Sequence, residues 1–489
     1  MTQLMMQSLS LLLIVAFGCV LSLLLIAWRR SQKLILAFTL AVFMCALFAS
    51  VSLIFSFTDS VQITTLMKVD NYGSFAFILI LVASMAVSLL SSTWLTHSVE
   101  VHDEFFILLQ LVVLGAGVLV MSDHFASLFL GFELLSIALV GMVGYNRDSQ
   151  YSVESAFKYL ILSASASSFM LLGIAFIYSQ SGSLSFTYAI EPIQSLFYSV
   201  GFLLFLVGVA FKLSLAPFHL WTPDVYQGAP TPVTLLLATV SKVSMFVVLI
   251  KVCFSQSAFF THQSELNILT LISILAILSM LIGNFLALKQ QNIKRLLAYS
   301  SIAHMGYLLI VLMITSQQSM KLAWQSALFY LTAYVIATIS LFMVLQFTQN
   351  RHMNLQQDTE KSIDGWQGMF WQNRLLALLI IVSILSLAGI PLTAGFIGKF
   401  YLLNVAVQSQ QWWLIAALIV GSGIGLFYYL RIIFTLFIVE SLEKGNNLPN
   451  DIENPVVTPV TSIPVIIFIL ASVILGVYPD LLSKILIIL

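Results

Sequence analysis

The feature that most constrains this chain is a series of long apolar runs that recur along nearly its whole length. A run of about 20 apolar residues crosses the ~30 Å hydrocarbon core of a bilayer as one α-helix. With 60% hydrophobic and 8% charged residues, a soluble fold would expose large apolar faces to water. A transmembrane β-barrel would instead alternate polar and apolar residues in shorter segments. The sequence therefore predicts an all-α, polytopic membrane protein.

We expect about 14 transmembrane helices joined by mostly short polar loops. The seventh and twelfth spans are too long for a single crossing, and both contain proline and glycine. Since proline removes a hydrogen-bond donor and kinks a helix, we expect both spans to be broken. The expected spans are 8–27, 34–57, 72–95, 105–121, 124–143, 156–179, 197–226, 230–253, 268–288, 294–315, 322–347, 375–407, 412–438 and 458–480.

Lysine and arginine are distributed unevenly between the two sides of these spans. Loops that follow odd-numbered spans hold most of the loop lysines and arginines, among them Arg29, Arg30, Lys361 and Lys444. Because cytoplasmic loops are enriched in these residues, we expect both termini on the periplasmic side. The first run precedes its basic residues, which is the reverse of a cleavable signal peptide. Length and span count are typical of a protein of the bacterial inner membrane.

The two long spans also indicate an internal repeat. The tetrapeptide LSLA occurs at 213–216 and at 385–388, each time shortly before a proline. Paired interrupted helices mark transporter folds built from two repeats, and an odd number of helices makes the second repeat inverted. We therefore divide the chain into an N-terminal three-helix segment, a first five-helix repeat, an inverted second repeat, and a C-terminal loop with helix 14. These segments cover 1–104, 105–253, 268–438 and 439–489.

Five ionisable residues fall near the middle of predicted spans: Glu133, Lys212, Lys242, His304 and Lys399. A charged side chain at the bilayer centre costs about 2.5–3.5 kcal/mol on insertion scales. This cost is smallest where such groups face each other in a hydrated interior. The series predicts a path for protons or ions, although a lone lysine could be a structural ion-pair partner and a lone histidine a packing residue.

The helix breaks lie beside two of these lysines. Pro217 follows Lys212 and leaves the Leu213 carbonyl without its helical donor, and Pro391 precedes Lys399. We expect carbonyl groups freed by the breaks to hydrate or accept hydrogen bonds from the ammonium groups. Irregular backbone at this depth is tolerated only where it is buried in protein or lines a water-filled cavity.

Two further residues belong to the candidate site with a weaker argument. Lys158 begins the sixth span, where it either extends to the membrane surface or pairs with Glu133. His219 lies two residues after Pro217. A pair of Glu133 and Lys212 at ~4 Å would interact by about 4 kcal/mol at an effective dielectric near 20. Moving a proton against 100 mV costs roughly 2.3 kcal/mol, so forming or breaking this pair could load or release a proton.

The sequence shows no site for a cofactor, a metal or nucleic acid. Cys19, Cys45 and Cys253 all lie in apolar runs, so we expect buried thiols without a disulfide, iron–sulfur or zinc site. The GSGIG stretch at 421–425 follows no strand, and we interpret it as small-residue helix packing. The formal net charge of zero argues against nucleic-acid binding.

The charged and broken segments resemble the antiporter-like subunits of respiratory complex I. The similarity covers essentially all of the chain, and WTPDVYQGAP is its most discriminating part. The strings that carry it are FLGFELLSIALVGMVGY, SAFKYLILSASASSF, FKLSLAPFHLWTPDVYQGAPTPV, NIKRLLAYSSIAHMGYLL and LSLAGIPLTAGFIGKFY.

This resemblance implies a 14-helix fold and proton transfer through Glu133, Lys212, Lys242 and Lys399. It implies a subunit of a translocase in which NADH, FMN, iron–sulfur clusters and quinone are held by partner subunits. The expected partners are sister antiporter-like subunits, small membrane subunits and the lipid bilayer. Two alternatives remain: a module of a cation/proton antiporter, and a structural or quinone-docking membrane scaffold.

Overall fold

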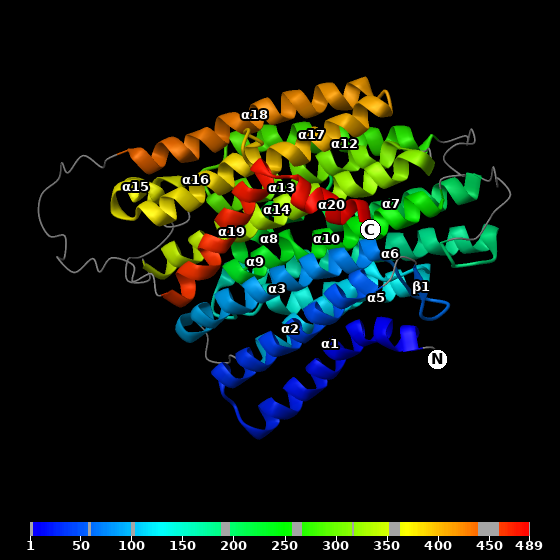
Figure 1. Cartoon of the computed structure of the whole chain (residues 1–489), viewed down its shortest axis with the longest axis horizontal. Coiled ribbons are helices and arrows are strands. Elements are labelled where there is room, and N and C mark those ends of the chain that lie inside the picture. Colours follow the sequence, from blue (N-terminus) through cyan, green and yellow to red (C-terminus); the bar gives the residue numbers. More distant parts are fainter. Residues whose placement is uncertain are drawn as a thin grey trace, which may run out of the picture.

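The computed structural model describes most of the chain as one bundle of helices that run side by side (Figure 1). The N-terminal helices lie along one flank and α18 lies along the opposite flank. The predicted loop basic residues Lys361 and Lys444, and most of the predicted C-terminal loop, lie outside the described residues. The described residues are 3–56, 60–98, 103–186, 196–256, 267–314, 317–351, 362–438 and 459–488.

A multi-pass helical membrane protein is confirmed. Within the described ranges, 11 helices are long and apolar enough to cross a membrane, and a bent pair brings the number to as many as 12. That pair is α19 (Pro459–Val477) and α20 (Asp480–Ile488), whose axes differ by 82°. Two further apolar helices, α4 (Glu104–Val120) and α16 (Arg374–Ala388), are shorter. The expected number of 14 spans stays a prediction.

Three helices precede the first predicted repeat. They are α1 (Gln3–Trp28), α2 (Gln32–Ser56) and α3 (Asn71–Ser98). A small antiparallel hairpin between α2 and α3, β1 (Val61–Gln62) with β2 (Lys68–Val69), was not predicted. It is too short to show an alternating pattern in the sequence. The Lys68 amide donates to the Met121 carbonyl at 2.9 Å, which fixes the hairpin to the turn after α4.

The first half of the bundle continues from α4 and includes the first broken span. Glycines let α4 and α5 approach closely, because a Cβ at Gly115 would lie 2.7 Å from the Leu135 amide nitrogen. Small residues at such contacts are typical of membrane helix packing. The helices are α5 (Phe125–Val143), α6 (Gln150–Ser181), α7 (Leu196–Leu213), α8 (Trp221–Gly228), α9 (Thr231–Ala238) and α10 (Val240–Ser255).

The second half has a similar start, since a Cβ at Gly283 would lie 2.8 Å from the Ala303 amide nitrogen of the next helix. Its first helices and the short turn after them are α12 (Ile268–Leu288), α13 (Ile293–Leu308) and the 3₁₀ helix η1 (Leu309–Met313). The others are α14 (Gln317–Arg351), η3 (Ile363–Trp366), α15 (Met369–Gln372), α16, α17 (Ala394–Gln408) and α18 (Trp412–Phe437).

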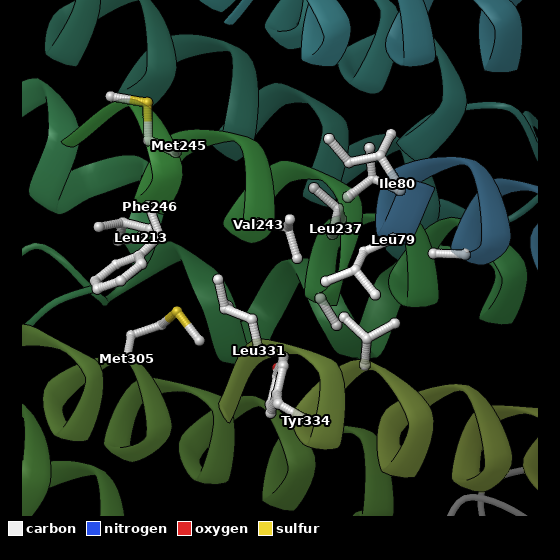
Figure 2. Close-up of a cluster of buried hydrophobic side chains, with 14 of the residues drawn as sticks. Leu79, Ile80, Leu213, Leu237, Val243, Met245, Phe246, Met305, Leu331 and Tyr334 are labelled. Atoms are coloured by element: carbon white, nitrogen blue, oxygen red, sulfur yellow. The ribbon is translucent and has the colours of Figure 1, made fainter. Parts of the chain in front are cut away.

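The core is centred on the span formed by α9 and α10. The most apolar stretch of this span is completely buried. Figure 2 shows Val243 and Phe246 of α10 in a cluster with Leu79 of α3 and Leu331 of α14. Met305 of α13 joins the same cluster. Apolar side chains from the N-terminal helices and from both halves therefore meet around α10, which places this helix at the centre of the bundle.

Both long predicted spans are broken, but their LSLA tetrapeptides adopt different structures. In the first, α7 ends at Leu213, Ser214 has a φ of 63°, and the Leu215 amide donates to the Ala210 carbonyl at 2.8 Å. In the second, the tetrapeptide is the last turn of α16. Proline disfavours helical backbone in the residue before it, and Pro217 follows the first LSLA directly.

Two residues separate the second LSLA from its proline, which leaves space for a normal helix end. Gly389 follows α16 with a φ of 80°, in the left-handed region that glycine adopts without a steric cost. The amides of Gly389 and Ile390 both donate to the Leu385 carbonyl at 3.0 Å. Two different local causes therefore interrupt the two spans.

Candidate functional site

Lys212 is buried at the end of α7 and is held by neutral groups. Its Nζ donates to Ser136 Oγ of α5 at 2.7 Å and to the Tyr159 hydroxyl of α6 at 2.9 Å. The ammonium also lies 5.0 Å from the centre of the Phe132 ring, within cation–π range. Side chains from two neighbouring helices, α5 and α6, thus fix its position.

The expected carbonyl contact at the first break is not made by Lys212. The Phe211 carbonyl accepts a hydrogen bond from Trp221 Nε1 at 3.0 Å instead. The indole satisfies a carbonyl that the helix end leaves free, because Trp221 begins α8 and its side chain reaches back to α7. The ammonium of Lys212 is left to the hydroxyls of the neighbouring helices.

Glu133 lies one turn before Ser136 on α5 and interacts electrostatically with Lys212. No ion pair joins the two side chains in the described part of the chain, and Glu133 Oε1 is buried without a hydrogen-bond partner. The hydroxyl of Ser136 takes the contact with the ammonium. The expected Glu133–Lys212 contact is therefore not formed in this conformation.

Lys158 does not pair with Glu133, so that alternative was wrong. Its Nζ lies 2.7 Å from Glu154 Oε1 and 3.0 Å from Asp224 Oδ2, and its side chain is 43% exposed. Asp224 also binds Arg295 Nη1 at 2.7 Å. Lys158 belongs to this partly exposed cluster. Asp224 was not predicted as a partner, because its position after the break does not show which helices it meets.

Lys242 lies on α10 and is fully buried. Its Nζ forms a very short hydrogen bond with Ser301 Oγ of α13, and Ser301 Oγ bonds the Tyr334 hydroxyl of α14 at 2.7 Å. The ring of Tyr226 on α8 lies 5.7 Å from the same ammonium. Lys242 therefore contacts residues of both halves of the bundle.

His304 is hydrogen-bonded at both ring nitrogens. Nδ1 lies 2.5 Å from the Tyr330 hydroxyl, and Nε2 lies 3.3 Å from the Tyr429 hydroxyl, which in turn bonds Ser300 Oγ. A neutral imidazole has one donor and one acceptor nitrogen, so it can pass a proton between two hydroxyls. The packing interpretation of His304 does not account for these polar contacts.

Lys399 contacts a carbonyl that is left free at the second helix break. Its Nζ donates to the Ala388 carbonyl, the last of α16, at 2.7 Å, and lies 5.3 Å from the Tyr307 ring centre. His304 is within electrostatic range of both Lys242 and Lys399. A cavity of about 10 Å³, the lower limit for one water molecule, is lined by Lys399, His304, Tyr330, Ala333, Tyr334, Ser386, Leu387 and Gly395.

His219 is buried beside the first break and interacts with the Pro217 backbone, while its Nδ1 has no hydrogen-bond partner in the described ranges. Cys45 is exposed, contrary to the expectation of three buried thiols, whereas Cys19 and Cys253 are buried. Within the described ranges, no three His, Cys, Asp or Glu side chains are grouped as a metal site would require.

The hydroxyl residues that bind Lys212, Lys242 and His304 were not predicted from the sequence. A usable signal exists, because Tyr330 and Tyr334 are four residues apart in an apolar span and share one face of α14. The residues that supply these contacts are Ser136, Tyr159, Ser300, Ser301, Tyr330, Tyr334 and Tyr429.

Two buried lysines, a half-buried lysine and a buried histidine, held mainly by hydroxyls inside a helical bundle with two broken spans, are typical of membrane proteins that handle ions or protons. A family model described as NADH:quinone oxidoreductase/Mrp antiporter, transmembrane, matches residues 122–425. The chain belongs to this family, and it is an antiporter-like membrane subunit.

The chain is also similar over its whole length to solved structures. One is a chain of respiratory complex I from Thermus thermophilus with bound aureothin, at 29% identity and a TM-score of 0.80, covering 97% of this chain and 98% of that one.

Two others share the fold at lower identity. One is a chain of an archaeal membrane-bound sulfane sulfur reductase (22% identity, TM-score 0.84, covering 99% of this chain and 96% of that one). The other is a chain of the Mrp complex from a Dietzia species (19% identity, TM-score 0.82, covering 99% of this chain and 96% of that one). All three belong to multisubunit membrane complexes, which is consistent with membrane-subunit partners.

Proposed function

We propose that this chain is a proton-translocating subunit of the bacterial NADH:quinone oxidoreductase, and that it is subunit N of that complex. The resemblance along residues 1–489, with WTPDVYQGAP at 221–230, supports this assignment. The nearly complete mutual coverage with a chain of respiratory complex I also supports it. NADH, FMN, iron–sulfur clusters and quinone would then be bound by partner subunits, which supply the redox energy.

The proposal includes 14 spans, with two inverted five-helix repeats. Three similarities support the repeats, which would run from α4 to α10 and from α12 to α18. The first two helices of each approach through a glycine, Gly115 in one and Gly283 in the other. The third helix is long in both, with 32 residues in α6 and 35 in α14, and the fourth span is broken in both. The protein would lie in the bacterial inner membrane with both termini periplasmic.

The observation that carries the function is the kind of partner that holds each interior lysine. Lys212 and Lys242 are bound by hydroxyls and Lys399 by a carbonyl, and no carboxylate of the described residues contacts any of them. A carboxylate partner stabilises the charged lysine, whereas burial disfavours it. Lysines with neutral partners can therefore exchange protons, and hydroxyls and imidazole lie between them to carry the proton.

Glu133 has the role of a switch in this proposal. Its Oε1 is buried and unpartnered, while Ser136 on the same helix holds Lys212. A side-chain movement that brings the carboxylate to ~4 Å from the ammonium would add about 4 kcal/mol at an effective dielectric near 20. This exceeds the roughly 2.3 kcal/mol needed to move a proton against 100 mV. Contact would load a proton on Lys212, and separation would release it.

The test replaces Lys212, Lys242 and Lys399 one at a time by alanine in the assembled complex. We expect NADH-driven proton uptake by sealed membrane vesicles to fall, with the amount of assembled complex unchanged. Lys289→Ala is the matched control, because Lys289 is an exposed lysine at the end of α12. Undiminished proton translocation in all three interior variants would overturn the proposal.

The same variants separate the alternatives. The family also includes Mrp antiporter subunits, and proton movement that depends on sodium would favour a cation/proton antiporter. Loss of assembly in Lys212→Ala, rather than loss of pumping with assembly intact, would favour a structural scaffold.

A further inference from the structure

The first helix break and α8 contain a concentration of buried polar atoms that have no hydrogen-bond partner among the described residues. They are Ser214 Oγ, His219 Nδ1, Thr222 Oγ1 and the Tyr226 hydroxyl, all within thirteen residues of the chain. Leaving one buried polar group unsatisfied costs about 1–3 kcal/mol. Four such groups in one segment are therefore expensive unless a polar ligand binds there.

Two of these groups share one face of α8. Thr222 and Tyr226 are four residues apart, so their side chains lie on the same side of the helix, and both are fully buried. The Thr222 backbone amide is already used, since it donates to the His219 carbonyl at 2.9 Å. The side-chain hydroxyls of Thr222 and Tyr226 remain unsatisfied among the residues that the structure describes.

This face lies between two of the interior lysines. On one side the ring of Tyr159, whose hydroxyl binds Lys212, packs 5.0 Å from the Trp221 ring at the start of α8. On the other side the Tyr226 ring faces the Lys242 ammonium at 5.7 Å. The Tyr226 hydroxyl interacts electrostatically with Tyr159 and is near Ser301, although no hydrogen bond of good geometry forms.

The hydrogen bonds of Lys212 and those of Lys242 do not connect at this place in the described part of the chain. Lys212 connects to Tyr159, and Lys242 connects through Ser301 to Tyr334. No hydrogen bond links these two groups among the residues that the structure describes. The unsatisfied hydroxyls of α8 are therefore located where a connection between Lys212 and Lys242 is needed.

We infer that Thr222 and Tyr226 bind water that relays protons between Lys212 and Lys242. This inference rests on the proposed function and adds the ligand and the residues of one transfer step. A proton leaves Nζ of Lys212 for a water molecule, and that water passes one of its own protons to the Tyr226 oxygen. The Tyr226 hydroxyl releases its proton towards Ser301 and Lys242, so the phenol and the water are unchanged at the end.

If Tyr226 had only a packing role, Tyr226→Phe would leave proton transfer unchanged. In Tyr226→Phe the ring keeps its contact with the Lys242 ammonium, because this contact needs only the aromatic face. The substitution removes an unsatisfied hydroxyl and should not destabilise a dry site. Only a relay role makes the hydroxyl necessary for proton transfer.

The experiment measures NADH-driven proton uptake in vesicles for Tyr226→Phe and Thr222→Val, beside Lys242→Ala. We expect Tyr226→Phe to reduce the rate to the level of Lys242→Ala and Thr222→Val to reduce it partly, with normal assembly. Tyr198→Phe and Thr435→Val are the controls. Tyr198 is buried and bonds Gln256 at 2.9 Å, and Thr435 bonds the Ile432 carbonyl of its own helix at 2.6 Å.

Two outcomes separate this inference from the proposed function. If Lys242→Ala stops proton uptake while Tyr226→Phe is normal, the relay is wrong and the proposed function stands. If both variants pump normally, the relay is wrong, and the proposed function is wrong as well when Lys212→Ala and Lys399→Ala also pump normally.

A fluorinated tyrosine at position 226 keeps the test valid if Tyr226→Phe fails to assemble. It has nearly the same shape as tyrosine, but its hydroxyl is more acidic, so we expect a changed pH dependence of proton uptake. An unchanged pH profile would overturn the inference. In an experimental map of the complex, we expect water between Thr222 and Tyr226, and apolar contact around both hydroxyls would overturn it as well.

Discussion

Gly395 is the residue at which one added methyl group should most disturb the second helix break. It lies in the first turn of α17, and its amide donates to Ser386 Oγ of α16 at 3.2 Å. A Cβ at this position would lie 1.8 Å from the Ser386 carbonyl oxygen and 2.7 Å from its carbonyl carbon. Ordinary contacts begin at 3.4 Å, and backbone atoms cannot turn aside as a side chain can.

In Gly395→Ala, α16 and α17 therefore have to separate by about 1.6 Å at this contact. Inserting a methyl group into a well-packed interior costs about 1–3 kcal/mol, and occasionally more. A change of one or two kcal/mol alters the folded to unfolded ratio by a factor of about 5–30. Gly395 also lines the cavity beside Lys399, so the same movement displaces the ammonium from its position. We expect lower stability and slower proton translocation together.

The assay measures the melting temperature of the solubilised complex and the proton uptake of vesicles for Gly395→Ala and for the control Gly423→Ala. Gly423 lies on α18, is exposed, and has nothing within 4 Å of the position of an added Cβ. Alanine favours a helix over glycine by up to about 1 kcal/mol, so this control should be unchanged or more stable. Wild-type melting and proton uptake in Gly395→Ala would refute the reasoning.

Three further predictions concern other parts of the fold. Asp70→Asn should lower the melting temperature, because it removes the carboxylate 2.8 Å from Lys251 Nζ, and the Lys251 side chain is only 11% exposed. The double variant Asp70→Asn with Lys251→Met should recover part of the loss. A membrane-permeant maleimide should label Cys45 well before Cys253, because only Cys45 is exposed; equal labelling would contradict the packing. Burial raises the pKa of Asp123, so its folded form keeps the proton to higher pH than its unfolded form. The stability that Asp123 contributes is therefore greatest in acid and is lost as the pH rises. Asp123→Asn should have a higher melting temperature than wild type at neutral pH, and this difference should vanish in acid.

Much of the architecture could be predicted from the sequence, because it depends on local properties of the chain. A membrane helix satisfies its own backbone and is apolar over a fixed length, so its position can be read from hydropathy alone. Breaks near Pro217 and Pro391 were expected from the prolines in both spans, although the second helix ends at Gly389. The depth of Lys212, Lys242 and Lys399 in their spans follows from counting residues.

The contacts between helices could not be predicted in this way. Lys158 binds Asp224 rather than Glu133, and Lys212 binds Ser136 and Tyr159 rather than a carbonyl. Such partners depend on how each helix is rotated and shifted against its neighbours, and hydropathy gives the depth of a residue but not its direction.

The LSLA tetrapeptides show the same limit, since one is unwound and the other helical. The apolar spans, their breaks and the interior charges were thus determined by the sequence itself. Which hydroxyl meets which lysine was decided only by tertiary packing, because a hydrogen bond requires two atoms from distant parts of the chain within about 3 Å.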